Sequence, residues 1–218
     1  MGCAALERRV VSPQTKFIDR GTFKDKENEI NIGNWNNKGL GEVTFSDVIK
    51  FSINTCMAEI GLKLGENNLV GFAEAFGFGS TTGIELDGEE SGIMHNPRRM
   101  YKADVAVMSL GQGIAVTPLQ MLRAICTIAN GGELVQPYIV KKIIAPNGEV
   151  THEGKRKVVG RPVSTEVAYE MRKMMEQVVE SGGGKAAAIK GYRIAGKTGT
   201  AQKLTEKGDY RGEKYIRI

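Results

Sequence analysis

Residues 191–203 read GYRIAGKTGTAQK, and the fold depends on what this stretch does. From Gly191 to Thr198 it matches the phosphate-binding formula G-x-x-x-x-G-K-T. That formula binds phosphate where a buried strand precedes the first glycine and a helix follows the threonine, because the helix N-terminus supplies the field for the phosphates. Here GGGKAAAIK precedes Gly191, and glycine and polar residues follow Thr198. The surroundings therefore argue against a nucleotide site.

The composition is that of a packed globular chain with a mildly basic surface. The 218 residues are 41% hydrophobic and carry a formal net charge of +5, which fits one large domain or two small ones. Lysine and arginine are interspersed with aspartate and glutamate, which is typical of a solvated surface, although anionic cell-surface material or substrate carboxylates would also suit it. No basic run interleaves with aromatic residues, so we expect no nucleic-acid partner.

The cysteines and histidines indicate no disulfide framework, metal site or cofactor. Cys3, Cys56 and Cys126 are odd in number and widely spaced, and His95 and His152 lie at no ligand spacing from them. Two of these thiols, at Cys56 and Cys126, fall in apolar helical patterns. We therefore predict that both are buried as small hydrophobic side chains.

The ends of the chain have the pattern of a fragment. MGCAALE resembles the last turns of a helix, and KYIRI resembles the start of a strand. The chain shows no signal-peptide core and no apolar run long enough to span a bilayer.

Three helices are predicted from caps and apolar spacing. The first begins after the N-cap Thr44 and reaches Leu64, with a break near Ser52; the second follows the N-cap Thr117; the third covers residues 164–181. Alternation from residue 192 predicts a strand, which residues 204–214 connect to an antiparallel partner beginning at Tyr215. This order of elements predicts an α+β fold with an antiparallel sheet flanked by helices.

Lys-Thr-Gly has a second known use, at the edge of a strand beside an acylatable serine. The full motif set is S-x-x-K, S-x-N and K-T-G. S-x-N is present at Ser52, Ile53 and Asn54, where the first helix is predicted to break. K-T-G is present at residues 197–199.

With the text between the two motifs, the chain resembles the transpeptidase domain of class B penicillin-binding proteins. The matching blocks are NWNNKGLGEVTFSDVIKFSINTCMAEIGLKLG, FGFGSTTGIELDGEESG, SLGQGIAVTPLQMLRAICTIANGG and VVESGGGKAAAIKGYRIAGKTGTAQK. The resemblance implies the penicillin-binding/serine β-lactamase-like fold. It also implies that residues 1–218 are an incomplete transpeptidase domain, with the nucleophile segment before residue 1 and the last strands and closing helix after residue 218.

The chain departs from the family pattern at the nucleophile. No lysine has a serine three residues before it; Ser12 to Lys16 is one residue too long, and Thr200 to Lys203 begins with threonine. The resemblance therefore implies a serine D,D-transpeptidase by family, in which this fragment is inactive because S-x-x-K is absent.

The resemblance also implies roles for the residues that are present. Ser52 would relay a proton between the leaving nitrogen and the lysines, Asn54 would donate to a substrate amide carbonyl, and Lys197 would supply positive potential. In the K-T-G strand, Thr198, Gly199 and Thr200 would bind substrate: the two threonine hydroxyls grip its terminal carboxylate, and the Thr200 N–H forms half of the oxyanion hole.

In such enzymes the reaction builds the bacterial cell wall. The serine attacks a stem peptide ending in D-Ala-D-Ala, and a neighbouring stem peptide resolves the acyl-enzyme into a cross-link. The implied partners are these peptides, β-lactam antibiotics and cell-wall synthesis or division proteins, at the extracytoplasmic face of the cell membrane. Two alternatives stay open: a non-catalytic binding module of the same fold, and a serine β-lactamase relative.

Overall fold

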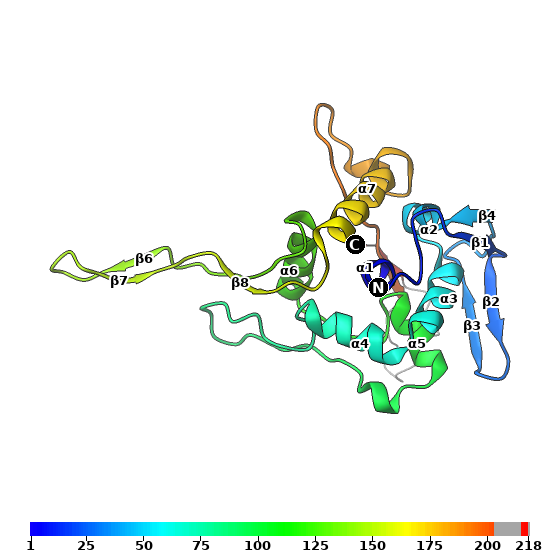
Figure 1. Ribbon diagram of the computed structural model, residues 1–218, viewed down its shortest axis with the longest axis horizontal. Helices are drawn as coiled ribbons and strands as arrows, with labels where there is room; N and C mark the ends of the chain where they lie inside the picture. The colour runs from blue at the N-terminus through cyan, green and yellow to red at the C-terminus, as the bar shows by residue number, and fades with distance from the viewer. Residues whose placement is uncertain (203–214, 218) are drawn as a thin grey trace.

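The computed structural model describes residues 1–202 and 215–217, which form an α+β fold (Figure 1). Lys203 and the predicted connection over residues 204–214 lie outside the described residues. The helices are α1 (Gly2–Glu7), α2 (Phe45–Phe51), α3 (Asn54–Leu64), α4 (Glu66–Ala75), α5 (Lys102–Ser109), α6 (Pro118–Ala129) and α7 (Thr165–Ser181), with short 3₁₀ turns at η1 (Pro97–Arg99) and η2 (Lys185–Ala187).

The strands form five antiparallel pairs in the described part of the chain. Their bounds are β1 (Lys16–Asp19), β2 (Thr22–Asp25), β3 (Ile30–Gly33), β4 (Gly41–Thr44), β5 (Leu134–Gln136), β6 (Lys142–Ile144), β7 (Val150–Glu153), β8 (Lys157–Gly160), β9 (Thr200–Gln202) and β10 (Tyr215–Arg217). The pairs are β1–β4, β2–β3, β5–β8, β6–β7 and β9–β10.

The first predicted helix is confirmed, together with its break. Thr44 caps α2 through a reciprocal capping box with Asp47. The helix ends at Ser52, which takes a left-handed conformation (φ 56°, ψ 52°). Ile53 then turns into the core at 2% exposure, and α3 begins at Asn54.

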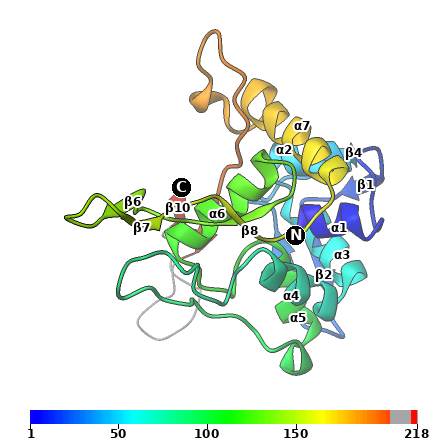
Figure 2. The same cartoon turned by 60° about the vertical axis from the view of Figure 1, so that its left-hand side comes forward.

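The main core lies between α1, α2, α3 and α7. Its buried side chains include Leu6, Phe45, Ile60, Met171 and Val178. The predicted third helix is confirmed as α7, with the Ser164 hydroxyl accepting from Val167 N. Figure 2 shows α7 beside α2, and the two helices are in contact.

The second predicted helix is confirmed as α6, but the burial predicted for Cys126 is wrong. The buried side of α6 is Gln120, Arg123, Ala124 and Thr127, whereas Met121, Leu122, Ile125 and Cys126 are exposed. Gln120 and Arg123 are buried against the loop after α4, where Gln120 donates to the carbonyls of Ser80 and Ser91 and Arg123 to those of Thr82 and Gly77. The Thr127 hydroxyl donates within the helix, to the Arg123 carbonyl. Cys56 is buried as predicted.

The predicted strand at residue 192 is only partly correct. Residues 193–199 carry no strand, and β9 begins at Thr200, where it pairs with Arg217 of β10. A strand needs a hydrogen-bonded neighbour. Among the described residues, this segment is paired only from Thr200 onward, by β10.

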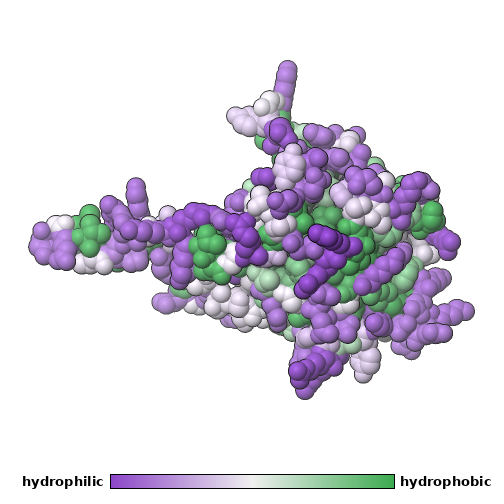
Figure 3. All heavy atoms as spheres, in the orientation of Figure 1, coloured by the Kyte–Doolittle hydropathy of each residue, from purple (hydrophilic) through white to green (hydrophobic). Residues whose placement is uncertain are grey.

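A narrow arm carrying β6, β7 and β8 projects from the body (Figure 1). Aliphatic side chains appear along it in Figure 3; Ile139, Ile143, Ile144 and Val150 are 47–62% exposed. Across the described residues, no helix combines the length and apolar character that crossing a bilayer requires.

Candidate active site

Ser52 lies at the turn between α2 and α3, and the core on both sides fixes that turn. Ser52 N and Ile53 N still donate to the carbonyls of Ile49 and Val48, at 3.4 and 3.0 Å, so the chain leaves α2 in a tight turn. The left-handed conformation of Ser52 is uncommon for a residue other than glycine and costs about 1–3 kcal/mol, which the surrounding packing must offset. The Ser52 side chain is half-buried.

Lys197 reaches this turn because α7 holds the segment that carries it. Gly196 N donates to the Met175 carbonyl of α7 at 3.1 Å. At the end of α7, Gly182 lies so near α2 that a side-chain carbon there would come within 2.6 Å of the Lys50 carbonyl oxygen. Glycine therefore allows the close approach that brings the end of α7, and the chain that follows it, to Ser52.

The two motifs meet in a direct hydrogen bond. Lys197 Nζ donates to Ser52 Oγ at 2.7 Å across 145 positions of sequence, and also to the Thr198 carbonyl at 3.0 Å. Desolvation lowers the pKa of Lys197 from 10.5 to about 8. Lys197 is nevertheless exposed by surface area, so water screens part of this effect and limits the size of the pKa shift. The pair therefore joins a hydroxyl to an ammonium group that loses its proton at mildly alkaline pH.

The other predicted residues are placed less closely around this pair. Thr198 is half-buried with its side chain near Gly183, Gly199 is exposed, and Thr200 opens β9. Asn54 Nδ2 donates to the Gly33 carbonyl at 3.2 Å. The structure thus brings Ser52 and Lys197 together, and it holds Asn54 against the end of β3.

A buried polar cluster that the motif analysis missed lies behind Asn54. Asp19, Asn34 and Thr55 are 2%, 7% and 5% exposed and are joined by hydrogen bonds. One signal was available: alternation in KFID places Asp19 on the same side of β1 as the buried Phe17.

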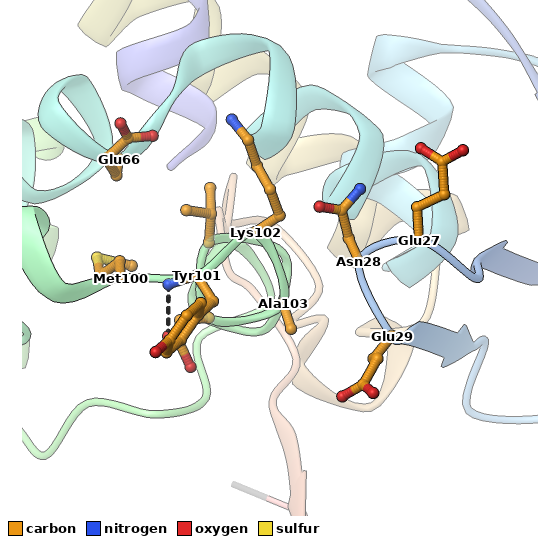
Figure 4. Close-up of a pocket in the computed structure, with 10 residues that line it drawn as sticks. Glu27, Asn28, Glu29, Glu66, Met100, Tyr101, Lys102 and Ala103 are labelled. Carbon is orange, nitrogen blue, oxygen red and sulfur yellow. Dashed lines mark hydrogen bonds between the residues drawn. The ribbon is translucent and has the colours of Figure 1, made fainter.

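A separate cavity of about 550 Å³ lies between the β2–β3 turn and the start of α5 (Figure 4). Its lining includes Glu27, Glu29, Glu66 and Tyr101, and the dashed line marks the 2.8 Å bond from Tyr101 N to Asp104. None of the predicted site residues lines it.

Comparison with known proteins decides the family. Residues 1–217 match the penicillin binding protein transpeptidase domain. The chain belongs to the penicillin-binding protein transpeptidase family. As a member of this family, it is 36% identical over 215 residues to stage V sporulation protein D of Bacillus subtilis, covering 98% of the chain and 33% of that relative. It is 37% identical over 171 residues to the peptidoglycan D,D-transpeptidase FtsI of Escherichia coli, covering 78% of the chain and 27% of FtsI.

Solved structures of penicillin-binding proteins have the same fold. Penicillin binding protein 3 from Mycobacterium tuberculosis, in its apo form, superimposes with a TM-score of 0.90 at 29% identity, covering 99% of this chain and 50% of that one. The D,D-transpeptidase domain from Eggerthella lenta gives 0.87 at 29% identity, covering 93% and 52%. This transpeptidase-family chain therefore has the predicted fold, and it spans 33% and 27% of the length of the two curated relatives.

Proposed function

We propose that residues 1–218 are the substrate-binding part of a peptidoglycan D,D-transpeptidase, which cross-links stem peptides through an acyl-serine intermediate. The hydrogen bond between Lys197 and Ser52 carries the proposal. It joins the K-T-G and S-x-N motifs, which in this motif set flank an acylatable serine. Family membership and the FtsI relative support the same reaction class.

In this proposal Ser52 and Lys197 act as a proton relay. Lys197, with its pKa lowered to about 8, donates to Ser52 Oγ, and Ser52 passes a proton toward the leaving nitrogen. The ammonium form also supplies positive potential for the carboxylate of a D-Ala-D-Ala terminus. The relay therefore needs the pKa of Lys197 to lie close to the working pH, so that both the ammonium and the amine forms are populated.

The remaining motif residues are proposed to bind the donor peptide. Asn54 donates to a substrate amide carbonyl, and Thr198 and Thr200 bind the terminal carboxylate through their hydroxyls. The N–H of Thr200 forms half of the oxyanion hole, with Gly199 keeping the approach open. Removal of one such donor typically reduces the rate by about 10²–10³-fold.

The chain itself contains no S-x-x-K, so acylation requires a segment carrying that motif in addition to residues 1–218. The proposed partners are stem peptides ending in D-Ala-D-Ala and β-lactams, and one M. tuberculosis relative was solved in complex with ampicillin. We place the assembled enzyme at the extracytoplasmic face of the cell membrane, with cell-wall synthesis or division proteins as partners.

The test is a chimera that supplies the missing nucleophile. Residues 1–218 replace the corresponding part of the B. subtilis relative, whose own chain provides the rest of the domain. The expected result is release of D-alanine from an acyl-D-Ala-D-Ala peptide, reduced by about 10²-fold or more in Lys197→Ala. A folded chimera that releases D-alanine equally well with Lys197→Ala would remove the proposed role of this lysine.

A further inference from the structure

Asp19 is a buried carboxylate that accepts a hydrogen bond from Thr55, the residue after Asn54. It ends β1 at 2% exposure, and its oxygens accept five hydrogen bonds. The Oδ1 atom accepts from Gly21 N and Asn34 Nδ2 at 2.9 Å and from Thr55 Oγ1 at 2.7 Å. The Oδ2 atom accepts from Asn34 Nδ2 and Leu40 N at 2.9 Å.

The negative charge of Asp19 is stabilised by these neutral donors and by no cation. No lysine, arginine or histidine among the described residues forms an ion pair with it. Burial alone would raise the pKa of Asp19, but hydrogen bonds from Gly21, Thr55, Leu40 and Asn34 lower it overall. Asp19 therefore stays ionised at neutral pH and holds its donors with charge-assisted bonds.

Two of these donors, Thr55 and Asn34, help to form the first turn of α3. Thr55 lies in that turn, and Asn34 contacts it from a distant loop. The N-cap of α3 is Ile53, whose side chain has no oxygen to accept from the first-turn amides. Asn34 supplies the missing acceptor from a distant loop, because its Oδ1 accepts from Thr55 N at 3.3 Å. Its Nδ2 is held by Asp19, so the carboxylate orients the amide that caps the helix.

The same loop holds Asn54. The Gly33 carbonyl, one residue before Asn34, accepts from Asn54 Nδ2 at 3.2 Å. Gly33 and Asn34 thus bind successive residues of α3, Asn54 through its side chain and Thr55 through its backbone. Any displacement of Asn34 would move both contacts together.

We propose that Asp19 is a positioning residue for the S-x-N turn, acting through Asn34 and Thr55 to set the location of the Asn54 amide. It touches no reacting group; it fixes the first turn of α3 through its bonds to Thr55 and Asn34. The significance of Asn54 rests on the proposed function, whereas the positioning is a property of the folded chain and is measured without catalysis.

The test uses the side-chain amide of Asn54 in protein labelled with ¹⁵N-asparagine. Its resonance is assigned by its loss in Asn54→Asp. In Asp19→Asn we expect the resonance to shift or broaden, and its exchange with water to become about tenfold faster, because the bond to Gly33 opens more often. Thr55→Val removes the hydroxyl that bonds to Asp19 and, at 3.9 Å, contacts Cys56 Sγ. It should give the same change, and Thr55→Ser should restore the wild-type signal.

Asp25→Asn is the matched control. Asp25 also ends a strand and accepts from Glu27 N and Asn28 N, but it has no bond to α3. It should leave the Asn54 resonance unchanged. If Asp19→Asn and Thr55→Val lose stability while the Asn54 signal and its exchange rate keep their wild-type values, Asp19 is merely structural and the proposal is overturned. Should Asp19→Asn fail to fold, the comparison of Thr55→Val with Thr55→Ser gives the answer alone.

Discussion

At the scale of single residues, Ser52 combines two demands that oppose each other. Its position between α2 and α3 requires a left-handed backbone, which glycine adopts most easily, yet the bond to Lys197 requires a hydroxyl. Serine meets the second demand at the expense of the first. Such strain at a functional position persists when the surrounding packing fixes it, here through the buried Ile53.

Because Ser52 has a left-handed backbone, glycine should be more stable than alanine at this position, the reverse of the usual order. Ser52→Gly and Ser52→Ala both remove the hydroxyl, and they differ only in the Cβ atom at φ 56°. We expect Ser52→Gly to be more stable than Ser52→Ala by about 1 kcal/mol, measured by urea unfolding. The opposite order would show that the left-handed turn is absent in solution.

Lys197 predicts a pH dependence with a definite sign. Its folded pKa of about 8 lies below its ordinary value of 10.5, so between these values the unfolded chain binds more protons. The contribution of Lys197 to the free energy of unfolding should therefore rise with pH across this window. Titration of ¹³Cε-labelled lysine, with Lys197→Arg to assign the signal, should give one midpoint well below the others. A midpoint near 10.5 would contradict the desolvated site.

The three cysteines should differ in reactivity because two are buried and one is exposed. Desolvation raises the pKa of Cys3 and of Cys56 to about 11, whereas Cys126 is exposed on α6. Thiolates are the reactive form, so at pH 8 an aromatic disulfide reagent should modify Cys126 rapidly and the other two only after unfolding. Cys126→Ser should abolish the rapid phase, and a rapid phase that persists in this variant would show that the core is open.

At the scale of elements, the helix starts were predictable from the sequence, and so was the antiparallel strand beginning at Tyr215, whereas the start of its partner β9 was not. Thr44 and Thr117 identify their helices because capping is local, involving residues within one turn. The start of β9 depends on a partner that begins at Tyr215, so alternation from residue 192 could not locate it. The buried side of α6 also depends on distant carbonyls, which a periodic pattern does not reveal.

Substitution of Gln120 measures how much the buried polar side of α6 contributes to stability. It is fully buried, its Nε2 donates to the Ser80 and Ser91 carbonyls, and its Oε1 accepts from Thr117 N. Gln120→Met keeps the size and leaves these groups unpaired, so we expect a loss of about 2–4 kcal/mol in urea unfolding. Thr117→Ala, which removes only the cap, should cost about 1 kcal/mol. Equal losses in the two variants would argue against the loop contacts.

At the scale of the whole molecule, the sequence identified both motifs but not how they meet. Pairing of S-x-N with K-T-G followed from the family resemblance, while the contact depends on α7 packing against α2 and on Gly182 at its end. The Asp19 cluster escaped prediction for a similar reason. Its members are Asp19, Asn34 and Thr55, which are distant in sequence and match no motif.

The central claim is that residues 1–218 supply the Ser52–Lys197 side of a transpeptidase site and lack the nucleophile. Labelling with a fluorescent penicillin, followed by gel electrophoresis and intact mass, tests it most directly. The chain alone should show no covalent adduct, because it has no S-x-x-K serine. The chimera with the B. subtilis relative should be labelled on its supplied serine, about 10²-fold more slowly in Lys197→Ala. A stable adduct on residues 1–218 alone, or a folded chimera that remains unlabelled, would contradict the account.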